Sequence, residues 1–539
     1  MRQLSSADWT MVALDTATAH NTIGIVGIYD PSTRGESRGP LTYEEVLKYL
    51  GARLHVAESF RERLVEVPFG LDRPWWIRDG DFDLEYHVRE IALPAPGSWR
   101  QLCTQIARIH ARPLDLARPP WELYLIDGLD GVDHLPQGAF AVFLRIHHAA
   151  IDGVAGAEIL TAMHSQEPQE SAPPVPQDYH WEPDAVPSDL DMLSRAALHG
   201  VARPVDVLRQ VVSVAPQLPA LVSDTRDPSV TSPATLPRAT RFNQVVSPHR
   251  VFGTAYTTLD VLKEIRAAVP NATINDVGVA VVGGAIRRYL LDKDELPDDA
   301  MVAMMPISVR PTATRASGTA GSGSSTQTSG NEYSVAPITM ATDEADPLER
   351  LARIVTSTAH VKESGAHPVR ALIAMSEEAI GGLMGTVQRA AVRALSRRGR
   401  TVAAHTLVSN VPGPQTPMYF CGAQMVDTTG LGPVLDGMGL NNGIGSYGNR
   451  VTFCFTADRK ALPDPEVYEQ CLSDAVEELL VAARAKVQAE PAVAAPAVAA
   501  ATKKAPAKKT PAKAAAVKKA PVKKAPVKKA PVKKAPSSS

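Results

Sequence analysis

Apolar residues follow helix-like or strand-like spacings in successive segments of the first 169 residues. They recur every three or four positions, as in amphipathic helices, over residues 41–54, 98–114 and 154–164. Two runs, 121–129 and 139–148, are rich in apolar, aromatic and β-branched residues, which predicts strands. We therefore expect a mixed α/β domain over residues 1–169.

A second α/β domain is predicted over residues 249–488. Helical spacing recurs in three segments, over residues 258–269, 275–292 and 464–487. Strand-like runs cover residues 301–310, 401–414 and 449–458. The intervening residues 170–248 begin with a proline-rich acidic stretch, and their helical segments are broken at Pro204 and Pro216. This composition is typical of a linker that crosses between two domains.

The last part of the chain, residues 489–539, differs from the rest in composition and charge. It repeats proline with paired lysines, and such a sequence cannot bury a core, so we expect it to be disordered. Residues 501–539 hold thirteen lysines and no acidic residue, whereas the whole chain has a net charge of −2. A basic tail therefore follows an acidic body, and it could bind anionic lipid or nucleic acid.

Length and composition restrict the class of protein further. A chain of 539 residues is too long for one hydrophobic core, which supports two domains. Four scattered cysteines show no metal-binding spacing and favour a reduced intracellular protein: Cys103, Cys421, Cys454 and Cys471. No signal peptide and no apolar run long enough to cross a bilayer are found, so any membrane contact is expected to be peripheral.

The segment RIHHAAIDG, from Arg145 to Gly153, carries the clearest candidate chemistry. Two histidines end a predicted strand, and an Asp-Gly pair follows the second. The spacing alone leaves three interpretations open: structural histidines beside a turn, metal ligands, or a general base. A metal site would need more ligands, and the nearby Asp133 and His134 do not complete a known motif.

Several further motifs occur in a fixed order between residues 4 and 460. They are LSSADW, RPWWIRDGDFDLEYHVRE, PLDLARPPWELYLIDGL, HHAAIDG, INDVGVAVVGGAIRRYL, MMPISVR, SGNEYS and VSNVPGP. Together they resemble the bacterial wax ester synthase/acyl-CoA:diacylglycerol acyltransferase family, part of the chloramphenicol acetyltransferase-like group. One departure is Pro120, which stands where that family usually has leucine. The tail lies outside the resemblance.

The resemblance implies two chloramphenicol acetyltransferase-like α/β domains with a channel at their interface. It also implies that His148 is the catalytic base, because the catalytic imidazole of the HxxxDG motif lies four residues before the aspartate. The base would take a proton from an alcohol that attacks the thioester of acyl-CoA, without an acyl-enzyme. Acyl-CoA would be a co-substrate, and no cofactor or metal is expected.

Supporting roles follow from the same resemblance. Asp152 is expected to pair with Arg310 and fix the corner, and Gly153 to leave space beside the imidazole. His147 holds substrate or backbone, or fills the corner; two adjacent residues at a strand end cannot both face one channel. Asn275 and Asp276 either cap a helix, form part of the channel floor, or contact substrate.

The predicted activity is transfer of a long-chain acyl group to diacylglycerol, with fatty alcohol as a second acceptor. Two alternative functions remain open. One is an acyltransferase that takes its acyl group from a carrier protein, and the other is a weakly active lipid-binding or scaffold protein on lipid droplets. The predicted location is cytoplasmic, on the inner face of the membrane or on droplets. Residues 370–400 form an amphipathic segment with a basic end, either an interfacial helix or an ordinary core-facing one.

Overall fold

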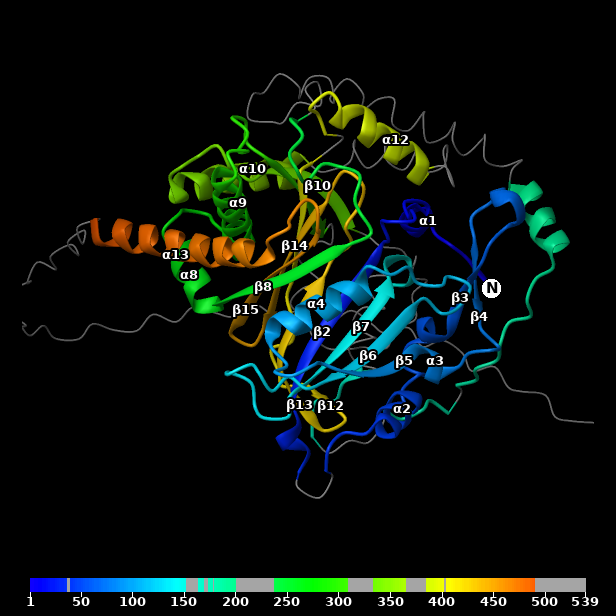
Figure 1. Cartoon of the computed structure of the whole chain (residues 1–539). Coiled ribbons are helices and arrows are strands. Elements are labelled where there is room, and N and C mark those ends of the chain that lie inside the picture. The colour runs from blue at the N-terminus through cyan, green and yellow to red at the C-terminus, as the bar shows by residue number, and fades with distance from the viewer. Residues whose placement is uncertain are drawn as a thin grey trace, which may run out of the picture. The chain divides into compact units, whose positions relative to one another are not determined.

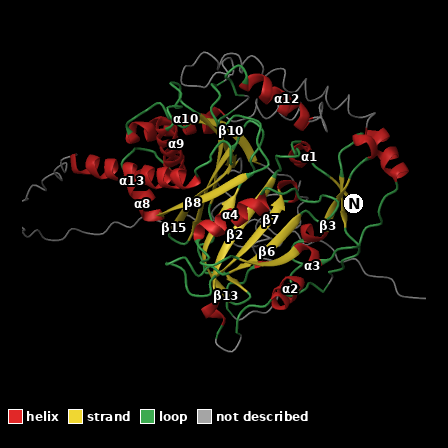
Figure 2. Ribbon diagram, in the orientation of Figure 1, coloured by secondary structure: helices red, strands yellow, loops and turns green. Residues whose placement is uncertain are grey.

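A computed structural model shows the arrangement of the chain (Figure 1). It describes residues 1–35, 39–151, 163–168, 173–177, 179–199, 237–308, 333–364, 384–401 and 404–489. The described residues form strands and helices in comparable amounts (Figure 2), so the expected mixed α/β class is confirmed.

One six-stranded sheet, called here the N-terminal sheet, carries the candidate histidines. Its strand order is β12 (Tyr419–Phe420), β13 (Ala423–Leu431), β2 (Thr22–Asp30), β7 (Phe140–His147), β6 (Trp121–Asp127) and β5 (Val88–Ala92). All neighbours are antiparallel except β5 and β6. A separate small sheet consists of β1 (Arg2–Gln3), β4 (Trp75–Arg78) and β3 (Glu62–Val65).

A second six-stranded sheet, called here the C-terminal sheet, is built from later residues. Its strand order is β10 (Tyr333–Thr339), β9 (Val302–Ser308), β11 (Thr406–Val411), β14 (Leu440–Tyr447), β15 (Arg450–Asp458) and β8 (Arg250–Thr258). Strand β11 pairs in parallel with both neighbours, and the other pairs are antiparallel.

Helices pack against both sheets. They are α1 (Ser6–Ala13), α2 (Tyr43–Gly51), α3 (Leu84–His87), α4 (Trp99–His110), α8 (Leu259–Ala267), α9 (Ile274–Asp292), α10 (Pro347–Ser364), α12 (Met384–Ser396) and α13 (Pro465–Ala489). Helix α9 is buried along most of its length because its residues are apolar on nearly every side. At Gly283 a Cβ atom would lie 2.6 Å from the Met340 carbonyl oxygen, so only glycine fits that approach.

Two strands from late in the sequence complete the N-terminal sheet. Strand β13 pairs with β2, and β12 pairs with β13, although the sequence predicts neither as a strand. Residues 249–488 therefore contribute strands to both six-stranded sheets. The described residues 1–489 form one compact unit.

The outer edge of β8 is covered by helices rather than left open. The Arg100 Nη1 atom of α4 donates to the Phe252 carbonyl oxygen at 3.1 Å, and the Thr254 amide donates to Glu469 of α13 at 3.2 Å. Arg100 also forms an ion pair with Glu469. An edge strand presents unpaired backbone groups, and these side chains satisfy two of them while joining the two sheets.

The helices and strands predicted from periodicity are found wherever their segments are described. Helix α2 begins at Tyr43 within the predicted 41–54, and β15 covers the predicted 449–458 almost completely. Most of the predicted helix 154–164 lies outside the described residues, as does the tail. Strands β2, β8 and β14 are found where the sequence predicted none.

None of the described helices is long and apolar enough to cross a membrane. Across the same described ranges, no group of three or more histidine, cysteine, aspartate or glutamate side chains gathers as metal ligands would. All four cysteines are buried thiols.

Candidate active site

The two histidines lie where the central strand β7 ends. All eight residues of β7 are buried between β2 and β6, and His147 is the last of them. His148 begins the short 3-10 turn η4 (His148–Ala150), which contacts helix α1. The His148 amide donates to the Asn21 carbonyl oxygen at 2.7 Å, so the strand exit has a fixed backbone path.

His147 is a buried side chain that holds the corner together. Only 1% of its surface is exposed, and its Nδ1 atom accepts the Ala149 amide at 3.2 Å. The proton therefore sits on Nε2, which lies 3.2 Å from the Asp15 Oδ2 atom and donates to it. Both ring nitrogens are thus engaged, and among the alternatives left open for His147 these contacts describe the one that holds the backbone.

His148 differs from its neighbour because part of its side chain is exposed. Burial of the rest lowers the pKa of His148 below its ordinary value of 6.5, and the neighbouring His147 lowers it further. The imidazole is therefore neutral at neutral pH. A neutral, accessible imidazole can accept a proton, which is the chemistry expected of a general base.

Two residues that the sequence did not single out support this corner. The Asp15 Oδ1 atom accepts the Asn21 amide at 2.7 Å, and Asn21 Nδ2 donates to the Met11 carbonyl oxygen of α1 at 2.8 Å. Asp15 lies 132 residues before His147, so no local spacing links them. The LSSADW motif contains the start of α1, the helix whose Met11 carbonyl oxygen accepts from Asn21.

A buried arginine holds β7 to the chain before it. Arg145 is 1% exposed, and its Nε atom lies 3.0 Å from a Glu122 carboxylate oxygen. Its guanidinium also donates to three backbone carbonyls, those of Ile109, Arg112 and Pro113. The PLDLARPPWE motif, which runs from Pro113 to Glu122, thus wraps around the arginine that lies just before the two histidines.

Asn275 and Asp276, the predicted pair at the start of α9, both form hydrogen bonds with other parts of the protein. Thr273 is the N-cap of the helix, and its side chain and that of Asp276 satisfy each other's backbone amides in a capping box. Asp276 also accepts the Thr358 hydroxyl at 2.7 Å. Asn275 accepts the Asn410 side-chain amide at 3.3 Å, which joins α9 to the SNVPGP segment.

Three predicted site residues lie outside the described residues: Asp152, Gly153 and Arg310. The expected ion pair between Asp152 and Arg310 therefore stays a prediction. The structure brings His147 and His148 together at one corner, and Asn275 and Asp276 at the start of α9.

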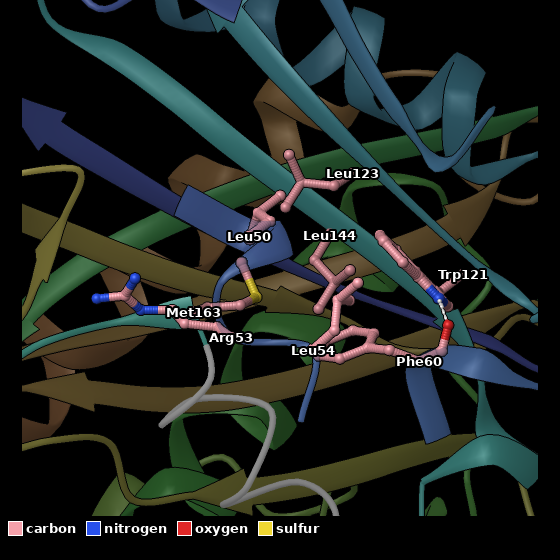
Figure 3. Close-up of a pocket in the computed structure, with 8 residues that line it drawn as sticks. All are labelled: Leu50, Arg53, Leu54, Phe60, Trp121, Leu123, Leu144 and Met163. Atoms are coloured by element: carbon pink, nitrogen blue, oxygen red, sulfur yellow. Dashed lines mark hydrogen bonds between the residues drawn. The ribbon is translucent and has the colours of Figure 1, made fainter. Parts of the chain in front are cut away.

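An apolar pocket lies on the face of the N-terminal sheet that α2 covers (Figure 3). Its lining consists of Leu50, Arg53, Leu54, Phe60, Trp121, Leu123, Leu144 and Met163. The Trp121 indole nitrogen donates to the Phe60 carbonyl oxygen at 2.9 Å, which fixes the ring. Ala149 and Ala150, next to His148, belong to the same apolar cluster as several of these lining residues, so the turn after the histidines packs into the apolar core of this sheet.

Comparison with known proteins shows the family and the fold of the chain. The model of the wax ester synthase/diacylglycerol acyltransferase catalytic domain matches residues 4–278, and that of the family's C-terminal domain matches residues 329–480. Rv3087 of Mycobacterium tuberculosis (strain H37Rv) is 31% identical over 502 residues, covering 90% of this chain and 98% of that protein. Rv1760 of the same strain is 30% identical over 488 residues, covering 89% and 90%.

Both relatives bear the name "putative diacylglycerol O-acyltransferase". Among solved structures, the wax ester synthase/diacylglycerol acyltransferase from Marinobacter aquaeolei VT8 has the same fold. It matches with a TM-score of 0.61 and 24% identity, over 89% of this chain and 100% of that one. The chain therefore belongs to the wax ester synthase/diacylglycerol acyltransferase family of acyltransferases.

Proposed function

We propose that this acyltransferase moves a long-chain acyl group from acyl-CoA to the free hydroxyl of diacylglycerol, forming triacylglycerol. Fatty alcohol is a second acceptor in this proposal. The observation that carries it is the unequal environment of the two histidines. His147 has both ring nitrogens engaged, whereas His148 is neutral and partly exposed.

The reaction follows from the chemistry of a neutral imidazole. His148 removes the hydroxyl proton while the alcohol oxygen attacks the thioester carbonyl carbon, which gives a tetrahedral oxyanion. The carbon–sulfur bond then breaks, an ester forms, and the departing thiolate takes the proton from the His148 imidazolium. Atoms and charges balance without a cofactor or an acyl-enzyme, so acyl-CoA and the alcohol suffice as substrates.

The surrounding corner would keep the base in place during this transfer. The His148 amide is tied to Asn21, and the preceding His147 is held by Asp15. A reacting group held in a narrow range of positions lowers the entropic part of the barrier. The apolar residues beside η4 would exclude water that could otherwise hydrolyse the thioester.

The direct test measures product formation by the full chain. Purified protein receives labelled palmitoyl-CoA with either diacylglycerol or hexadecanol, and the neutral lipids are separated. We expect labelled triacylglycerol with the first acceptor, together with release of one free CoA thiol per ester formed. Thiol release without ester would indicate a hydrolase, and no turnover with either acceptor would contradict the proposal. Peripheral attachment through residues 501–539 stays a prediction, since that segment lies outside the described residues.

The pH dependence of the rate gives a separate prediction. Only the neutral form of His148 can accept the proton, so activity is lost as pH falls through its pKa. Because burial lowers that pKa, we expect kcat/KM to hold down to a pH below the ordinary 6.5 before it declines. Initial rates between pH 5 and pH 8 measure this limb, with recovery of activity at pH 7.5 as the control for denaturation. A decline that is already complete at pH 7 would show that another group controls the rate.

A further inference from the structure

A short loop, residues 15–21, connects α1 to β2 and supports the histidine corner from one side. Its first residue, Asp15, accepts from His147, and its last residue, Asn21, accepts the His148 amide. The loop is a tight turn, in which the Thr16 amide donates to the Ala19 carbonyl oxygen at 2.8 Å. A shift of this loop would therefore displace the partners of both histidines together.

On its other side, the loop accepts hydrogen bonds from residues that are distant in sequence. Arg389 of α12 donates from Nη2 to the hydroxyls of Thr16 at 3.0 Å and Thr18 at 2.5 Å. Arg250, at the start of β8, donates to the Thr18 carbonyl oxygen. Helix α12 lies beside α1 in Figure 1, and the two helices are in contact.

Arg389 is itself held by an ion pair, so it can fix the position of the loop. Its Nε atom lies 2.7 Å from the Asp436 Oδ2 atom, and Asp436 is only 4% exposed. The Asp436 Oδ1 atom accepts the Val246 amide at 2.9 Å. Beside this ion pair, Ala19 of the loop forms a small buried apolar cluster with Val246 and Val434. The loop is thus held by two arginines, Arg389 and Arg250, and by an apolar contact of Ala19.

The sequence groups Arg389 with the basic end of the amphipathic segment 370–400, but the structure separates it from its neighbours. The side chain of Arg389 is 23% exposed and paired, whereas Arg393, one helical turn further along α12, is exposed to solvent. A planar guanidinium can bind a carboxylate and two hydroxyls at once, which an ammonium group cannot do in the same geometry.

We propose that Arg389 is a positioning residue for acyl transfer, acting on the histidine corner through the loop 15–21. This inference rests on the proposed function, in which His148 is the base. Arg389 does not touch the reacting atoms. It fixes the loop whose Asp15 and Asn21 hold the two histidines, and so ties the position of the base to helix α12.

The test compares Arg389→Gln with Arg393→Gln in the full chain. We expect Arg389→Gln to lower kcat about 10- to 100-fold, with KM for palmitoyl-CoA within about twofold of wild type, since geometry rather than binding is lost. Arg393→Gln serves as the matched control on the same helix and should keep both constants. A third variant, Arg389→Lys, keeps the charge facing Asp436. It should restore the melting temperature but leave kcat low, whereas a merely structural role would restore both.

A double-mutant cycle with Asp15→Asn tests whether the loop carries the effect. If both residues act through it, the double variant should be about as slow as the slower single variant. Independent effects, which multiply, would overturn the inference, and so would equal kcat values for Arg389→Gln and Arg393→Gln. The proposed function fails separately, if His148→Ala stays active. An inactive His148→Ala beside an unaffected Arg389→Gln would therefore refute only the role of Arg389.

Discussion

Replacing His148 by alanine should lower kcat by about 10²–10⁴-fold, the range expected when a general base is removed. The reason is the chemistry of the corner: His148 has a partly exposed, neutral ring, and His147 is engaged with Asp15 and the Ala149 amide. The fold should remain, because the His148 amide, which alanine keeps, donates to the Asn21 carbonyl oxygen and holds the strand exit. Initial rates of labelled triacylglycerol formation measure the loss of kcat, and a thermal melt shows whether the fold remains.

The control is His147→Ala, whose expected profile is the reverse. This ring is 1% exposed and joins the Ala149 amide to Asp15, so its loss removes the acceptor of that amide and the donor to Asp15 Oδ2. We expect a lower melting temperature and a smaller loss of kcat than for His148→Ala. A larger loss of kcat in well-folded His147→Ala would show that the other imidazole is the base.

Arg145→Leu should reduce the free energy of unfolding by about 3–5 kcal/mol, the range for breaking a buried ion pair by removing one partner. The leucine would leave the Glu122 carboxylate without its closest cation, and would remove the guanidinium donors from the carbonyls of Ile109, Arg112 and Pro113. Urea denaturation followed by circular dichroism measures the change. Soluble yield should fall as well, because a loss of this size is a large part of a typical domain's stability.

The matched control uses the same carboxylate. Arg89 also pairs with Glu122, at 3.1 Å, but its side chain is 37% exposed. Water screens such a pair, so Arg89→Leu should cost at most about 1 kcal/mol. Equal losses for the two variants would mean that burial of Arg145 does not set its contribution.

The sequence alone determined the features that depend on residues close together in the chain. The apolar run ending in two histidines became β7, because a continuous apolar strand can be satisfied only inside a sheet. The sequence predicts segment 275–292 as a helix, with Asn275 and Asp276 either capping it or contacting substrate, and α9 begins there with Asp276 in its capping box. The order of the family's motifs indicated the acyltransferase family, which the comparisons confirm.

Only the tertiary structure decided which distant residues meet. Strand pairing is set by contacts far apart in sequence, so periodicity could not show that β13 completes the N-terminal sheet beside β2. Contacts between distant residues also give the two histidines different environments. Asp15, 132 residues away in sequence, forms a hydrogen bond with His147, whereas the ring of His148 is partly exposed. Such contacts also turn Arg389 inward, because a helical period defines a face but not the partner that the face will meet.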